Sequence, residues 1–149
     1  MTVVSPDPWP RWLGLAGLLP FVASLAAAWW GPPPWQGVAI HAFLGYAAVI
    51  LSFLGGVHWG LALGTLAPGS VAFRRRLGMA VLPSLVAWSA LLLEPLPGTW
   101  LLVAGFVLLR AFEVGTTGLP AWYRRLRSAL TLGVVACHLL LILGVLLLA

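Results

Sequence analysis

Residues 38–63 read VAIHAFLGYAAVILSFLGGVHWGLAL, and no Asp, Glu, Lys or Arg interrupts them. An α-helix rises about 1.5 Å per residue, so about 20 apolar residues cross the hydrocarbon core of a bilayer. This stretch is longer than that and predicts a transmembrane helix with room to tilt. The rest of the chain is interpreted outward from this span.

The composition of the whole chain favours a membrane protein. The 149 residues are 62% hydrophobic and 7% charged, with eight basic and three acidic side chains. So few charges cannot cover the surface of a soluble domain of this size. The basic residues form short clusters between apolar runs without interleaved aromatics, which argues against a nucleic-acid partner. We therefore expect one integral membrane domain, residues 1–149, with membrane lipids around it.

Four further apolar runs accompany the first, each bounded by proline or glycine. Helix ends are expected at such residues. Pro20 and Pro83 fall inside spans, where neighbouring helices tolerate a kink. The sequence predicts an all-α polytopic helix bundle with five transmembrane helices, at about 12–30, 38–63, 77–93, 100–113 and 128–149.

The arginines predict the orientation of the bundle. With five spans, every basic side chain falls on one side of the membrane, and the loops near Pro32 and Pro95 carry none. Positively charged loops stay in the cytoplasm. We expect an N-terminus inside and a C-terminus outside, in the cytoplasmic (inner) membrane of a bacterium. The residues concerned are Arg11, Arg74, Arg75, Arg76, Arg110, Arg124, Arg125 and Arg127.

Small residues line one face of the 38–63 span. Helices in lipid associate where small side chains let two backbones approach closely. We therefore predict a helix-packing groove here; a groove for a lipid or quinone tail is the alternative. The groove comprises Gly45, Ser52, Gly56, Gly60 and Gly64.

Ionisable residues are expensive inside a membrane and mark candidate functional sites. By the predicted topology one group of polar residues lies in the cytoplasmic half, and Arg110 and Glu113, three positions apart, can pair on one helix face. The group is either a shared functional cavity or a structural ion pair with His58 packed elsewhere. Its members are His58, Trp59, Arg110, Glu113, Arg127 and Thr131.

The sequence gives little support to an enzyme. Phosphate-loop, zinc-protease and serine-hydrolase motifs are absent from it, and so is a pair of intramembrane carboxylates. His58 and His138 could ligate a haem from two helices, but their depths differ and no haem-attachment motif is present. Cys137 is expected to be a small core residue. We predict no cofactor, no metal and no catalytic residue.

Three segments resemble the family called domain of unknown function 3429, which includes transmembrane protein 69-like proteins and many proteobacterial proteins. They are LGLAGLLPF at 13–21, FLGGVHWG at 53–60 and LPAWYRRLR at 119–127, the last with Leu130 and Thr131. The middle segment is the most specific, and the similarity extends over about residues 12–145. The resemblance implies a compact helical inner-membrane protein and brings no activity, substrate or catalytic residue.

The leading interpretation is a non-enzymatic accessory, assembly or scaffold subunit. It would associate with other membrane subunits or with further copies of itself. A redox protein that binds quinone or haem near His58 and Trp59 is the first alternative. A small transporter is the second, disfavoured because few polar groups line any span.

Overall fold

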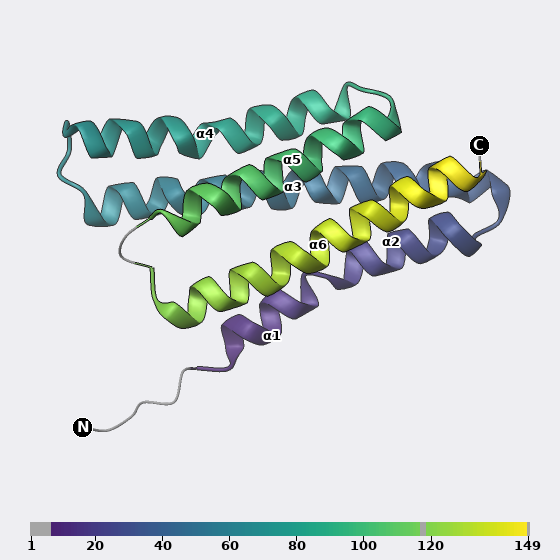
Figure 1. The fold of residues 1–149 in the computed structure, drawn as a ribbon, viewed down its shortest axis with the longest axis horizontal. Helices are drawn as coiled ribbons and strands as arrows, with labels where there is room; N and C mark the ends of the chain where they lie inside the picture. Colours follow the sequence, from purple (N-terminus) through teal and green to yellow (C-terminus); the bar gives the residue numbers. More distant parts are fainter. Residues whose placement is uncertain (1–6, 117–118, 149) are drawn as a thin grey trace.

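The structure, a computed structural model, describes residues 7–116 and 119–148, and within them the chain is all-helical (Figure 1). Most helices begin or end next to proline or glycine, as the sequence predicts, whereas α4 begins after the Ser70 cap and ends at Leu92. In chain order they are α1 (Trp9–Ala16), α2 (Leu19–Trp30), α3 (Pro33–Thr65), α4 (Val71–Leu91), α5 (Pro95–Val114) and α6 (Ala121–Leu148).

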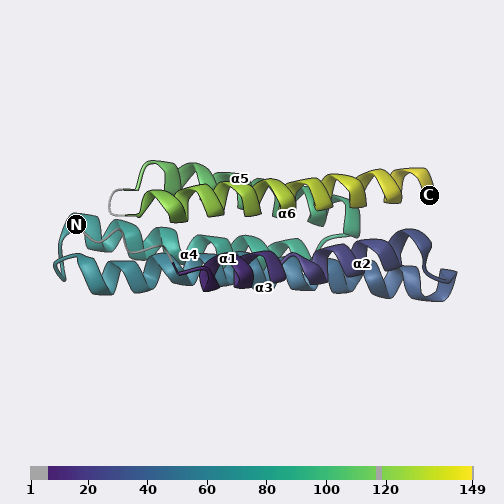
Figure 2. The same cartoon turned by 90° about the horizontal axis from the view of Figure 1, so that it is seen from below.

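The helices pack in two layers. In Figure 2, α5 and α6 form one layer and α1 to α4 form the other. The long helix α3 lies at the centre, between α2 and α4 in its own layer and against α5 in the other, while α6 lies against α1 and α2. The α3–α4 and α5–α6 connections lie at the same end of the bundle, which is the end that carries the arginine clusters.

Within the described residues, four segments are long and apolar enough to cross a membrane: Trp9–Trp30, Pro33–Thr65, Pro95–Val114 and Ala121–Leu147. They contain the predicted spans 12–30, 38–63 and 100–113 and most of the span 128–149, whose last residue, Ala149, lies outside the described residues. The remaining span, 77–93, corresponds to α4. Its three arginines near the start leave an apolar part shorter than about 20 residues.

The predicted kink at Pro20 is a break that separates α1 from α2. Proline has no N–H to donate, and its ring clashes with the carbonyl four residues earlier. The Tyr46 hydroxyl of α3 donates a hydrogen bond to the Gly17 carbonyl at this break, at 2.9 Å. A carbonyl left without an intrahelical partner must find another donor in lipid. Tyr46 therefore supports the broken first span from the neighbouring helix.

The predicted glycine groove is not a packing face within this chain. A Cβ atom placed on Gly45, Gly56, Gly60 or Gly64 would meet nothing within 4 Å, and the last three are exposed while Ser52 is half-buried. The close approach uses the adjacent face instead. A Cβ on Gly55 would lie 2.5 Å from the Ala80 carbonyl oxygen of α4. The chain thus packs α4 on Gly55, about 100° around the helix from Gly56.

We predict that Tyr46→Phe lowers stability by about 1 kcal/mol, because one hydrogen bond in the bundle is lost while the ring is kept. A denaturant titration in detergent micelles measures the change. Trp88→Phe on the exposed side of α4 serves as the control and should leave stability unchanged. Equal stability of Tyr46→Phe and the parent would show that the break needs no support from α3.

Candidate functional site

A buried acid lies where three helices meet. Glu113 occupies the last turn of α5, and its residue is 1% exposed. Two basic side chains reach it from other helices: Arg127 from the start of α6 and His58 from the inward face of α3, 5% and 1% exposed respectively. The sequence predicted that these residues lie in one half of the membrane, and the fold brings their side chains into contact.

Arg127 and Glu113 form a two-pronged ion pair. Arg127 Nε donates to Glu113 Oε1 at 3.2 Å and to Oε2 at 3.1 Å. Its Nη2 donates to Oε1 at 3.0 Å. The planar guanidinium matches the carboxylate, and such charge-assisted bonds are shorter and stronger than neutral ones. The pair fixes α5 and α6 relative to each other.

His58 completes the cluster from α3. Its Nε2 lies 3.4 Å from Glu113 Oε1. Among the described residues neither ring nitrogen has a hydrogen-bond partner. The ring packs edge-on against Phe112, with centroids 5.3 Å apart. Glu113 is therefore approached by a second nitrogen-bearing side chain, from α3.

The predicted pairing of Arg110 with Glu113 is wrong. Arg110 turns toward α6, where its Nη2 donates to the Ser128 hydroxyl at 2.7 Å and to the Arg124 carbonyl at 3.2 Å. Residues three apart on a helix are neighbours, but Glu113 faces the core while Arg110 lies on the side that meets the start of α6. The ion pair crosses between helices instead.

Trp59 and Thr131 were predicted to belong to the polar cluster, but neither of them contacts the ion pair through a hydrogen bond. Trp59 is 44% exposed and lies on the outer surface of α3, so it is not part of the buried group. Thr131 lies one turn after Arg127 on α6 and is 8% exposed. Its hydroxyl has no hydrogen-bond partner among the described residues. Thr131 and Arg127 share a cavity wall.

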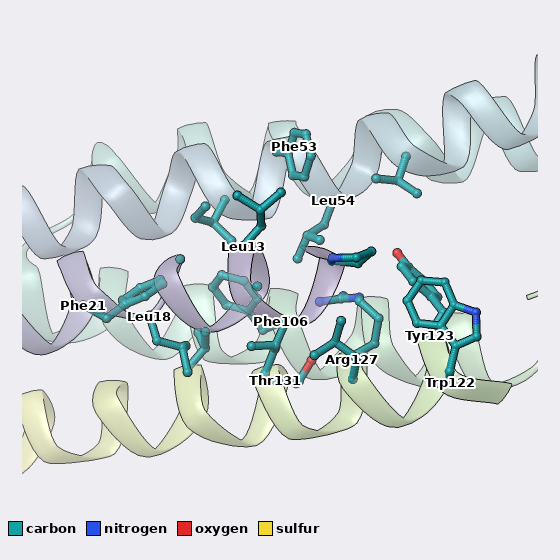
Figure 3. A pocket seen from close by; sticks show the side chains of 18 residues that line it. Leu13, Leu18, Phe21, Phe53, Leu54, Phe106, Trp122, Tyr123, Arg127 and Thr131 are labelled. Atoms are coloured by element: carbon teal, nitrogen blue, oxygen red, sulfur yellow. The ribbon is translucent and has the colours of Figure 1, made fainter. Parts of the chain in front are cut away.

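A cavity of about 520 Å³ opens beside the ion pair (Figure 3). Its walls come from α1, α2, α3, α5 and α6 and are almost entirely apolar. In Figure 3 Phe21 and Leu18 lie at one end, and Trp122 and Tyr123 lie at the other. Arg127 and Thr131 reach the same space from α6. The polar part of the cavity is therefore on the side of the ion pair.

The two histidines of the haem alternative lie in different surroundings. The His138 ring lies among Phe21, Phe43 and Phe106, at centroid distances of 5.8, 4.8 and 5.6 Å. Its Nδ1 is 2.8 Å from the Val134 carbonyl oxygen. His58 belongs to a different cluster, around Glu113. The His138 ring is thus packed among phenylalanines, while His58 faces a carboxylate.

Sequence reasoning missed Ser128 and Tyr123. The Ser128 hydroxyl accepts hydrogen bonds from the Arg110 guanidinium, and Tyr123 lines the cavity. Both are in the first turns of α6, one helical turn from Arg124 and Arg127, so the i, i+4 spacing was the available signal. In the sequence the positive charge of this segment predicted the membrane orientation and gave no indication of these side-chain contacts.

Comparison with known proteins places the chain in a family. A model described as protein of unknown function (DUF3429) matches residues 6–143. The chain belongs to the DUF3429 family. Transmembrane protein 69 of Xenopus tropicalis, a relative, is 34% identical over 128 residues, which cover 80% of this chain and 48% of that protein. The chain thus spans about half the length of this relative. No solved structure matches this chain.

A double-mutant cycle tests the ion pair in this DUF3429 protein. Removing one partner of a buried pair leaves an uncompensated charge and costs about 3–5 kcal/mol. We expect Glu113→Gln and Arg127→Met each to destabilise the protein, and the double variant to lose less than the sum. The free energy of unfolding in detergent micelles is the measurement.

The control cycle combines Glu113→Gln with Arg110→Gln. Coupling between residues in direct contact is about 0.5–3 kcal/mol, and it falls toward zero for residues without shared partners. A coupling energy larger for Arg110 than for Arg127 would restore the pairing within α5 and contradict the observed geometry.

Proposed function

We propose that this protein is a non-enzymatic accessory subunit of a membrane assembly in the bacterial cytoplasmic membrane. It would hold a transmembrane helix of another membrane protein against the open glycine face of α3. That face is defined by Gly45, Ser52, Gly56, Gly60 and Gly64. The observation that supports this proposal most directly is that the helices of this chain leave these glycines uncovered.

The open glycine face has the chemistry of a helix-docking surface. Gly56, Gly60 and Gly64 repeat every fourth residue, so they stack on one side of the helix over about two turns. Small residues at this spacing let a second helix approach closely enough for backbone and side-chain van der Waals contact, which drives association in lipid. Phe53 and Leu63, both exposed, flank the stripe and offer larger side chains to a partner.

The buried polar groups support a structural role for the rest of the chain. Glu113 and Arg127 neutralise each other, and Arg110 is bonded to α6. These bonds join α5 to α6, and His58 adds α3. A bundle fixed in this way presents a rigid outer surface.

The one-sided arginines support the proposed orientation. The α3–α4 and α5–α6 connections share one end of the bundle, and the sequence places the arginine clusters next to them. Arginine-rich loops remain in the cytoplasm. The proposal accordingly has this end, and the N-terminus with it, facing the cytoplasm.

Two glycine substitutions separate docking from folding. Gly60→Leu should leave stability in detergent unchanged or slightly higher, because the site is open and leucine favours helix more than glycine. Gly55→Ala should lower stability, because its methyl group meets the Ala80 carbonyl. Thermal unfolding in detergent measures both. A marked loss of stability in Gly60→Leu would show that the face is covered within the chain.

Cross-linking in native membranes tests the partner. In a Cys137→Ala background, Gly60→Cys should give an adduct with another membrane protein, and Gly60→Leu should reduce the amount of the parent complex on native gels. Leu132→Cys, exposed on α6, is the control and should give none. A disulfide-linked pair of copies would replace the accessory role by a homo-oligomer, and the absence of any adduct would contradict docking at this face.

Reporter fusions test the orientation. Fusions after Arg76 and after Arg127 should report a cytoplasmic location, and a fusion at the C-terminus should report a periplasmic one, because five spans place the two ends on opposite sides. A cytoplasmic C-terminus would require an even number of spans and would contradict the proposed orientation.

A further inference from the structure

The cavity of about 520 Å³ next to the ion pair has the dimensions and lining of a ligand site. Small-molecule sites usually measure about 300–1,000 Å³ and combine apolar walls with a few convergent polar groups. The apolar walls come from residues on five helices, with Leu54, Phe106 and Val134 among them. Such a wall takes a hydrocarbon chain.

The cavity meets the surface where large apolar side chains are exposed. Leu13 of α1 and Phe53 of α3 both line it, and each is 66% exposed. In Figure 3 Phe53 lies at the upper edge of the labelled side chains and Leu13 lies below it. In a bilayer these side chains face lipid, so a hydrophobic molecule reaches the cavity from the membrane without crossing water.

One buried polar group in the cavity wall, the Thr131 hydroxyl, has no hydrogen-bond partner among the described residues. Thr131 is more than nine-tenths buried. A buried polar group without a hydrogen bond destabilises the folded protein. Arg127 lines the same wall and uses Nε and Nη2 on Glu113, so the bonds shown for it leave Nη1 to donate elsewhere. The two side chains are one helical turn apart.

The electrostatic balance of this wall selects an uncharged acceptor. The positive charge of Arg127 is compensated by Glu113, with which it shares three hydrogen bonds. An anionic headgroup would compete with that carboxylate and leave it buried without its partner, which is strongly unfavourable. A carbonyl oxygen accepts hydrogen bonds from a guanidinium and a hydroxyl without disturbing the pair.

We propose that the cavity binds one membrane lipid with a hydrocarbon chain and an uncharged carbonyl oxygen, which accepts hydrogen bonds from Arg127 and Thr131. The chain extends from there along the apolar wall toward Phe21. The carbonyl has two sources in a membrane: the ring of an isoprenoid quinone and the ester of a neutral glycerolipid. This site adjoins the open glycine face at Phe53, but binding of the lipid is measured on the isolated chain and does not depend on the proposed partner.

Native mass spectrometry of the delipidated full chain in detergent tests the proposal. The probes are a short-chain isoprenoid quinone, a diacylglycerol, oleate and phosphatidylglycerol. At least one of the two neutral probes should bind with one-to-one stoichiometry and more tightly than both anions. The stronger neutral probe identifies the source of the carbonyl. Equal or tighter binding of oleate or phosphatidylglycerol would overturn the uncharged head, and the absence of any neutral adduct would overturn the site.

Matched variants locate the site. Thr131→Val removes the hydroxyl at nearly constant shape and should weaken binding about 2- to 10-fold, the equivalent of one hydrogen bond. It should not lower stability, because the hydroxyl has no partner in the empty protein. Val57→Trp fills the cavity from α3 and should abolish binding.

Thr99→Val is the control, because Thr99 is buried outside the cavity and its hydroxyl donates to the Pro95 carbonyl at 2.6 Å. It should lower stability and leave affinity unchanged. Unchanged affinity in Thr131→Val, or full binding in a folded Val57→Trp, would show that the probe sits elsewhere and would overturn the proposal. Circular dichroism and thermal unfolding establish that each variant is folded.

Discussion

The ion pair between Glu113 and Arg127 determines how the helices of this protein are arranged. A carboxylate or a guanidinium alone in hydrocarbon is prohibitively unfavourable, so each must meet the other or neutralise. Because the two residues flank the α5–α6 connection, their contact fixes the rotation and depth of both helices. His58 then brings α3 to the same point. Once these three helices are placed, α4 covers the remaining faces of α3 and α5, and the broken α1–α2 span covers those of α3 and α6.

Much of this architecture follows from simple features of the sequence. Apolar runs indicated where the helices lie, and proline and glycine indicated where they end. The span predicted at 100–113 begins earlier, at Pro95, because proline is well tolerated in the first helical turn, where its missing N–H has no partner to lose. The break at Pro20 was foreseeable as a kink. Its support by Tyr46 was not, because a contact between residues 29 positions apart leaves no local pattern.

The rotation of each helix about its axis was harder to predict. The glycines at positions 56, 60 and 64 signal close packing equally well whether the neighbouring helix belongs to this chain or to another. The chain packs on Gly55, whose single position makes no motif. Likewise Arg110 and Arg127 were both candidates to neutralise Glu113. Spacing along one helix favoured Arg110, while the tertiary fold favours Arg127, because Glu113 points to the interior and Arg110 points to the start of α6. His58 was grouped with Glu113 by its depth in the predicted topology, and the fold places it in the cluster. Trp59 lies one residue further along α3 and therefore turns outward.

Helix α3 shows how one transmembrane segment serves three environments. At about 100° per residue, His58 and Leu51 share the inward face, and Ile50 and Val57 lie next to them along the cavity. The outward side carries the glycines together with large exposed side chains such as Phe53. Because the compensated charge lies inward and stretches of bare backbone lie outward, the same helix can hold the interior of the bundle together while its outward side stays open to lipid or to a further helix.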